Sequence, residues 1–220
     1  MFDSRLQPIL RRTFAPIAAR LAENGVTADA MTIGGFAMGV AAAGAVALAF
    51  YKAALILILL NRLADGLDGA LARRLGPTDR GAFLDVALDF FFYALIPASF
   101  AFADPERNAL AGAALLLAFA GTGGSFLAFA AVAGGRRMKA AEFPTKGLYY
   151  LSGLTEGAET IAFFIATALW PLAFPPLAYA FATLCFATTL MRWRWGWIAF
   201  APEAAPASGA ISTAMKGNAK

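Results

Sequence analysis

The sequence predicts an all-α integral membrane protein with six transmembrane helices, preceded by an N-terminal amphipathic helix on the membrane surface. Of its 220 residues 60% are hydrophobic and only 15% are charged, less charge than the surface of a soluble domain carries. The apolar residues form six runs, each close to the roughly 20 residues that a spanning helix needs. Lys and Arg gather in clusters that alternate with these runs, a pattern typical of membrane topology signals.

The N-terminal segment, residues 2–22, carries too much charge to cross a membrane. Arginines take several of its positions, while its apolar residues recur at helical spacing: Leu6, Ile9, Leu10, Phe14, Ile17 and Leu21. This pattern predicts an amphipathic helix that lies on the membrane surface. We therefore expect residues 1–25 to form a juxtamembrane segment and residues 26–200 to form the membrane domain.

The six spans are joined mostly by short linkers, and the longest linker is the basic stretch 134–146. We expect the spans at residues 29–50, 53–75, 81–103, 109–133, 147–170 and 172–191. Only Lys52 and Arg107 fall on the odd-numbered loops, so the positive-inside rule predicts that both termini face the cytoplasm of a bacterial inner membrane. The tail 201–220 is rich in Ala, Pro, Ser and Gly, a composition typical of disorder.

Residue types limit the chemistry that this chain can perform. It has no His, and its single Cys, Cys185, lies inside an apolar run. Disulfides within the chain, His-based catalysis and zinc sites of the usual kind are therefore excluded. Acid, base or metal chemistry must come from Asp and Glu, with Lys or Tyr as further candidates.

Four aspartates stand in the middle of the second and third apolar runs. Asp65 and Asp68 lie three residues apart and Asp85 and Asp89 lie four apart, so each pair shares one face of its helix. Ionisable groups at such depth are costly and by default mark a functional site. Close carboxylates repel each other, and bound cations relieve that repulsion. Oxygen ligands without His or Cys favour Mg²⁺, Mn²⁺ or Ca²⁺.

Depth along the helices places the two pairs together. At the rise of an α-helix, Asp65 lies about 13 Å from the end of its helix near Arg74, and Asp89 lies about 12 Å from Gly81. The four carboxylates should therefore meet at one level, between the cytoplasmic surface and the middle of the bilayer. We expect a metal-centred cavity that opens to the cytoplasm.

The neighbours of these aspartates form a longer pattern. It reads Asp65-x-x-Asp68-Gly69-x-x-Ala72-Arg73, then seven residues, then Gly81-x-x-x-Asp85-x-x-x-Asp89. This pattern closely resembles the signature of the CDP-alcohol phosphatidyltransferase family, and all eight of its residues are present. The sequence departs from the family in two places. The gap is seven residues where eight is usual, and Thr27-Ala28-Asp29 stands where the family often has Thr-Pro-Asn.

The resemblance assigns roles to the residues of the pattern. It implies that Asp65, Asp68, Asp85 and Asp89 hold two divalent ions, Mg²⁺ or Mn²⁺, and that Asp89 also takes the proton from the attacking hydroxyl. The expected CDP-binding residues are Asp68, Gly69, Ala72, Arg73, Thr78 and Gly81. The glycines permit close approach of a nucleotide diphosphate, and the planar guanidinium of Arg73 is suited to a phosphate. Only proximity to the pattern suggests Thr78.

The family also implies a reaction. A phosphatidyl group would pass from CDP-diacylglycerol to a small alcohol, with release of CMP, in phospholipid biosynthesis. An alternative within the family is a CDP-amino alcohol donor with a diacylglycerol acceptor. A non-enzyme alternative is a divalent-cation transporter, which explains the carboxylates but not the glycines, alanine and arginine at their spacing. No nucleic-acid partner is expected, because topology explains the basic clusters.

The acceptor and the oligomeric state are less constrained. Glu156 lies about 13 Å along its span from Gly147, at the aspartate level, and is a candidate for binding the acceptor. Arg136 and Lys146 of the basic stretch are candidates for a phosphorylated acceptor, although positive-inside topology also explains them.

Arg62 and Glu159 both lie about 18 Å deep, which favours a structural ion pair between them. The family implies a homodimer, for which the sequence offers only glycines that permit close helix packing: Gly35, Gly39, Gly121, Gly123 and Gly124.

Overall fold

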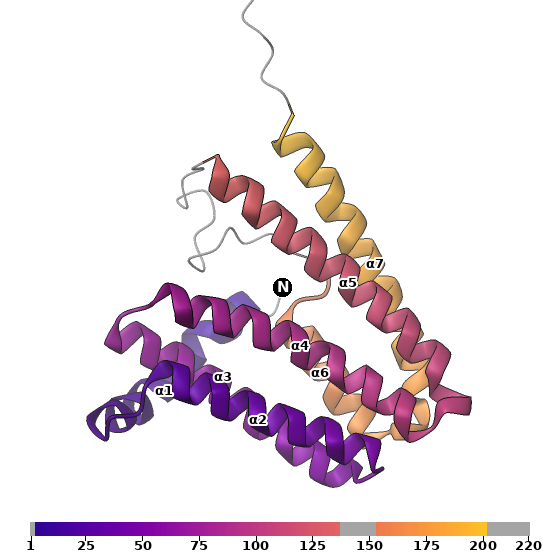
Figure 1. The fold of residues 1–220 in the computed structure, drawn as a ribbon, viewed down its shortest axis with the longest axis horizontal. Coiled ribbons are helices and arrows are strands. Elements are labelled where there is room, and N and C mark those ends of the chain that lie inside the picture. Colours follow the sequence, from indigo (N-terminus) through magenta and orange to yellow (C-terminus); the bar gives the residue numbers. More distant parts are fainter. Residues whose placement is uncertain (1–2, 137–152, 202–220) are drawn as a thin grey trace, which may run out of the picture.

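The computed structural model describes residues 3–136 and 153–201, and the regular structure of these two ranges is entirely helical (Figure 1). In chain order the helices are α1 (Asp3–Glu23), α2 (Ala28–Ala47), α3 (Tyr51–Leu75), α4 (Asp79–Ala103), α5 (Pro105–Gly135), α6 (Gly157–Leu169), the 3₁₀ turn η2 (Pro171–Ala173) and α7 (Phe174–Ala199). The tail for which disorder is expected lies outside these ranges beyond Ala201.

Among the helices of the described ranges, four are long and apolar enough to cross a membrane: α2, α4, α5 and the combined segment Pro171–Ala199. Helix α3 has 25 residues but carries Arg62, Asp65 and Asp68 in its central part. Helix α6 has 13 residues, which is short for a span. The structure therefore confirms an all-helical protein with membrane helices, and supports four spans by length and composition.

The predicted limits hold within four residues for α2 to α5, but not for the last two spans. The fifth span was expected from residue 147, whereas α6 begins at Gly157, after Glu156 in an extended conformation (φ −125°, ψ −171°). The sixth was expected to end at residue 191, whereas α7 continues to Ala199. Extended backbone before Gly157 changes the depth of Glu156 and Glu159, because the helical rise does not apply there.

Threonine caps set where α2 and α4 begin. Thr27 Oγ1 accepts a hydrogen bond from the backbone N–H of Ala30 (3.2 Å), and Thr78 Oγ1 accepts one from Gly81 (3.0 Å). Such side-chain oxygens satisfy N–H groups that a helix leaves without partners. Helix α3 ends at Gly76, whose φ of +99° suits glycine. The short turn between α3 and α4 reverses the direction of the chain, so the aspartates of α3 face those of α4.

Helix α2 packs against both α3 and α4, whereas α3 and α4 make few direct contacts with each other. Its small residues allow the close approach: a Cβ at Gly35 would lie 2.9 Å from Cβ of Ala64, and one at Gly39 would lie 2.7 Å from Cδ2 of Phe92. The prediction that these glycines let helices approach closely is confirmed. Because α2 holds the two helices from one side, space remains between α3 and α4.

The glycines of α5 serve the same purpose inside the chain. A Cβ at Gly121 would lie 3.0 Å from Thr189 Oγ1, and one at Gly123 would lie 3.0 Å from the ring of Phe90. Gly121 thus sits at the contact between α5 and α7, which run side by side (Figure 1). The glycines that offered sequence support for a homodimer are therefore largely used within one chain, and only Gly124 of the group meets open space.

The main core joins α2 to α7 through aromatic side chains. Phe92, Phe100, Phe164 and Phe174 are almost completely buried. The rings of Phe100 and Phe174 stack with centroids 4.3 Å apart, which ties α4 to the start of α7.

Helix α1 packs against α3 through a smaller cluster around Phe14, Ala18 and Leu71. The Phe14 ring fills the space over Gly66, where an added Cβ would lie only 2.3 Å from ring atom Cε2. Gly66 stands between Asp65 and Asp68 in the sequence. The N-terminal helix therefore supports α3 at the turn that carries two of the four aspartates.

We predict that Gly66→Ala destabilises the protein by about 1–3 kcal/mol, because the added methyl group overlaps the Phe14 ring. Thermal unfolding of the purified protein in detergent would measure the loss. Gly44→Ala is the matched control, since its Cβ position meets no atom within 4 Å. The double variant Gly66→Ala/Phe14→Leu should recover part of the stability. Simple addition of the two single losses would contradict this packing.

Candidate active site

A cavity lies between α3 and α4, with α2 along one side. All four predicted aspartates line it, so the depth argument that brought the two pairs to one level is confirmed. The further lining residues are Thr32, Gly35, Phe36, Asn61, Arg62, Leu88 and Phe92. The site is thus acidic, with one Arg and several apolar walls.

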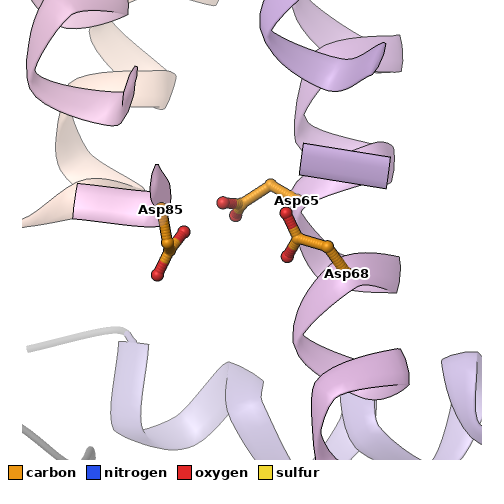
Figure 2. Close-up of side chains that lie close together, drawn as sticks. All are labelled: Asp65, Asp68 and Asp85. Atoms are coloured by element: carbon orange, nitrogen blue, oxygen red, sulfur yellow. The ribbon is translucent and has the colours of Figure 1, made fainter. Parts of the chain in front are cut away.

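Three of the carboxylates, which we call the aspartate trio (Asp65, Asp68 and Asp85), converge across the cavity (Figure 2). One oxygen of each lies within 4.8 Å of the others. Asp85 is exposed, Asp65 is partly buried and Asp68 is buried, so the trio runs from the open end of the cavity inward. Carboxylate oxygens at this spacing fit a hard divalent cation, and their mutual repulsion favours one.

Thr32 of α2 contributes to the trio, and sequence reasoning missed it. Its hydroxyl lies 2.7 Å from Asp68 Oδ2 and donates to it, and it also lies 3.0 Å from the backbone carbonyl of Ala28. Such a donor holds one carboxylate oxygen in place and leaves the other directed elsewhere. No spacing rule connects Thr32 to a residue on the next helix, so only the packing of α2 on α3 reveals it.

Asp89, the fourth aspartate, lies apart from the trio and has two partners of its own. Arg62 donates from NH2 to Asp89 Oδ1 at 3.0 Å, and the Tyr93 hydroxyl lies 3.3 Å from Asp89 Oδ2. Arg62 was expected to pair with Glu159, and that prediction is wrong. Glu159 instead accepts a hydrogen bond from the backbone N–H of Glu156 at the start of α6. The error came from counting depth along a helix that begins ten residues later than expected.

The residues expected to bind CDP lie toward the end of α3 and at the start of α4. Arg73 and Thr78 are exposed, Gly69, Ala72 and Gly81 are partly buried, and Asp68 is buried. A Cβ added at Gly69 would meet only Arg73 NH1, at 3.4 Å, so this face of α3 is open beside a guanidinium. Gly81 is more enclosed, with Thr78 Oγ1 and Asp29 Oδ1 at 3.1 and 3.2 Å from its Cβ position. Open backbone beside Arg73 is the geometry that a diphosphate needs.

Two neighbouring residues have structural roles. The Thr78 hydroxyl caps α4 by accepting from Gly81. Asp29, part of the departure from the usual family pattern, pairs with Arg80, whose Nε lies 2.7 Å from Asp29 Oδ2. The departure therefore forms a link between the start of α2 and the start of α4.

The residues expected to bind the acceptor do not line the cavity where they are described. Arg136, at the end of α5, donates to the carbonyl of Phe200 (3.2 Å) and lies over its ring. Glu156 accepts from the backbone N–H of Gly153 (3.0 Å) and precedes α6. Lys146 lies outside the described residues.

An acidic cavity between membrane helices, with a guanidinium beside open helix backbone, has the groups that bind a divalent cation and a phosphate. The family model described as CDP-alcohol phosphatidyltransferase matches residues 25–200, and the chain belongs to this family. It is therefore an enzyme and a transferase of phospholipid synthesis, and the cation-transporter alternative is set aside.

Several known proteins are similar to this chain. The inner membrane protein YnjF of Escherichia coli K12 is 50% identical over 192 residues, covering 87% of this chain and 93% of that protein. The archaetidylinositol phosphate synthase of Methanothermobacter thermautotrophicus is 38% identical over 87 residues, or 39% of this chain and 43% of that protein. The phosphatidylinositol phosphate synthase of Streptomyces avermitilis is 38% identical over 95 residues, which cover 40% of this chain and 37% of that protein.

Two crystal structures of Mycobacterium tuberculosis phosphatidylinositol phosphate synthase (PgsA1) share the fold. The structure with CDP-DAG bound has a TM-score of 0.70 and 24% identity, and covers 88% of this chain and all of that one. The complex with manganese and citrate has a TM-score of 0.68 and 25% identity, and covers 89% of this chain and 96% of that one. Together with the aspartate trio, the manganese complex supports use of a divalent metal by this chain.

We predict that Asn at any position of the trio lowers Mn²⁺ affinity at least about tenfold, since even indirect support of a metal site is worth that much. Without metal, the same variants should be as stable as the parent protein or more so, because one of the repelling charges is gone. Mn²⁺ binding by electron paramagnetic resonance and thermal unfolding would measure both effects. Asp79→Asn, an exposed change on α4 outside the cavity lining, is the control. Unchanged Mn²⁺ affinity in all three variants would contradict the site.

Proposed function

We propose that this protein transfers a phosphatidyl group from CDP-diacylglycerol to a small alcohol in a bacterial inner membrane, with release of CMP. The observation that carries the proposal is that the four aspartates of the family pattern line one cavity, with Gly69 and Arg73 following the trio on an open face of α3. The similarity to an inner membrane protein over most of both chains supports the location.

The proposed topology has six spans, with α3 and α6 added to the four that qualify by length and composition. Residues 26–200 would form the catalytic membrane domain, and residues 1–25 an amphipathic helix on the membrane surface. The excess of Lys and Arg on the even-numbered loops and at the ends supports cytoplasmic termini and a cytoplasmic active site. We keep the homodimer as a proposal that rests on the family alone.

Asp65, Asp68, Asp85 and Asp89 would hold the divalent metal, Mg²⁺ or Mn²⁺, and two ions remain the proposed number. Bound there, the metal supplies neutralisation of the donor diphosphate and of the charge that develops on departing CMP. Arg73 would bind a phosphate of the donor beside Gly69, where no side chain blocks the approach.

The chain's own base would be Asp89. The acceptor hydroxyl oxygen forms a bond to the phosphorus that carries diacylglycerol, while the bond from that phosphorus to the CMP oxygen breaks. The hydroxyl proton passes to a carboxylate oxygen of Asp89, within hydrogen-bond reach of the acceptor. Asp89 lines the same cavity as the trio without belonging to it, which suits a base that must reach the acceptor.

A phosphorylated polyol is the acceptor class that we favour. The two partial relatives that are named by their activity make archaetidylinositol phosphate and phosphatidylinositol phosphate. Glu156, the carboxylate that was a candidate for binding the acceptor, lies outside the cavity lining and accepts a hydrogen bond from the backbone N–H of Gly153. The basic residues Arg136 and Lys146 therefore keep their proposed part in acceptor binding, although the described Arg136 does not reach the cavity.

We predict that Asp89→Asn lowers the rate of CMP release by about 10²–10⁴-fold, the usual contribution of a general base. Binding of CDP-diacylglycerol should change little, because the trio and Arg73 remain. Single-turnover CMP release and equilibrium binding of the labelled donor measure the two quantities. Glu106→Gln, an exposed change in the first turn of α5, should leave both unchanged. Wild-type turnover by Asp89→Asn would rule out its role as base.

A panel of alcohols tests the acceptor class. Inositol, inositol phosphate, glycerol phosphate, serine and diacylglycerol would each be offered with the matching CDP donor, and lipid products read by mass. We expect product only with CDP-diacylglycerol and a phosphorylated polyol. Product from a CDP-amino alcohol and diacylglycerol would establish the alternative reaction.

A further inference from the structure

The tryptophans of this chain gather at the two ends of the segment formed by η2 and α7. There are four of them: Trp170, Trp193, Trp195 and Trp197. Trp170 directly precedes η2, and the other three, which we call the tryptophan cluster, lie in the last two turns of α7. Their exposed fractions are 63%, 61%, 38% and 85% in that order. The proposed reaction gives none of these exposed rings a role.

Trp170 and the tryptophan cluster lie about one bilayer thickness apart. From Phe174 to Trp193 the helix rises about 29 Å, close to the roughly 30 Å of a hydrocarbon core. No charged residue occurs in the sequence from 171 to 191, whereas Arg192 and Arg194 alternate with the first tryptophans of the cluster. Tryptophan rings prefer the headgroup level of a bilayer, and a guanidinium there can bind a lipid phosphate.

The end of α7 that carries the cluster is held by α5, which runs beside it (Figure 1). The ring centroids of Phe129 and Phe200 lie 4.8 Å apart, and Arg136 donates to the carbonyl of Phe200. Arg192 donates to the backbone carbonyl of Thr122 on α5 at 2.9 Å. These contacts fix the helix end while the tryptophan rings remain exposed, and a surface that is already ordered binds at lower cost.

A row of three side chains connects this end of α7 to the cavity. The guanidinium carbon of Arg192 lies 5.8 Å from the ring centroid of Phe126 on α5. The ring centroids of Phe126 and Phe90 are 6.3 Å apart, and Phe90 follows Asp89 on α4. Because Trp193 follows Arg192 in the same way, Trp193 and Asp89 lie at about the same level of the helix bundle.

We propose that the tryptophan cluster and Arg194 bind the phospholipid headgroup layer on the side of the membrane where the cavity opens. Through the row of Arg192, Phe126 and Phe90, this anchor holds the cavity at the level of the lipid phosphates. The anchor itself follows from the sequence and contacts of α7. Its use, which is to bring the cavity level with the diphosphate of a membrane-bound donor, rests on the proposed function.

Quenching of tryptophan fluorescence by spin-labelled lipids gives the first test. The full-length protein would be placed in vesicles of phosphatidylcholine and phosphatidylglycerol as Trp170→Phe, which leaves only the cluster, or as Trp193→Phe/Trp195→Phe/Trp197→Phe, which leaves only Trp170. In both variants a nitroxide near the headgroup should quench at least about twofold more than one near the end of the acyl chain, because the rings prefer the interface.

Three results would overturn this depth for the cluster. Stronger quenching by the deep nitroxide would place the rings in the hydrocarbon core. Quenching by aqueous iodide but by neither lipid would place them in water. Protection from all three quenchers would indicate a protein surface, such as a second copy of this chain, as the occupant.

Removal of the anchor gives the second test. Trp193→Leu/Trp195→Leu/Trp197→Leu keeps apolar side chains but lacks the preference for the interface. CMP release from CDP-diacylglycerol in vesicles should fall at least about tenfold, because a displacement of about 1 Å can cost about 10²-fold. In detergent, which imposes no bilayer depth, the rate should stay at the parent value. Mn²⁺ affinity should also be unchanged, since no residue of the cavity lining is altered.

Tyr179→Leu/Phe186→Leu is the matched control, because it removes exposed aromatic rings of α7 from the apolar stretch between the two ends. It should keep the parent rate in vesicles. Parent rates by the triple leucine variant in vesicles, or an equal loss in detergent, would show that the anchor does not set the depth of the cavity.

The tests remain decisive if other parts fail. Trp170→Phe leaves the cluster intact, so its quenching measures the depth of the cluster even if the triple variants do not fold, which thermal unfolding would show. Absence of CMP release by the parent protein would defeat the proposed function. The quenching experiment would still decide whether the cluster lies in the headgroup layer.

Discussion

Four carboxylates in one cavity of a membrane protein repel each other, and the surrounding structure is arranged around that repulsion. Like charges at this spacing, partly removed from water, need cations or donors beside them. The four carboxylates have different partners in the structure. The trio gathers at the open end with the Thr32 hydroxyl donating to its buried member, while Asp89 receives the Arg62 guanidinium. The trio thereby presents convergent carboxylate oxygens, and Asp89 lies beside it in the lining of the same cavity.

This division depends on helix spacing, which α2 controls. Because α2 packs against both α3 and α4 while those two barely meet, the cavity has a width fixed by small residues. Gly35 allows α2 to come within reach of the Asn61 amide, and Gly39 makes room for Phe92. Helix α1 supports α3 from another side, with Phe14 over Gly66. Catalytic geometry and helix packing therefore rest on the same small residues.

The donor and acceptor sides of the proposed reaction differ in how closely the structure defines them. The donor side is compact: the trio, the open face at Gly69 and the guanidinium of Arg73 follow each other along α3 and α4. The acceptor side draws on residues that lie far apart, such as Arg136 at the end of α5.

The sequence by itself determined the all-helical membrane class, four of the helix positions, the four aspartates at one level and the family. These depend on local composition and on spacing within one helix, which the chain alone fixes. Only the tertiary structure decided which charges pair. Thr32 and Arg62 find their partners across helices, and Glu156 and Glu159 turned out to start a helix, because side-chain contacts depend on how helices pack and where each begins. The spacing of residues in the sequence determines neither how the helices pack nor where each of them begins.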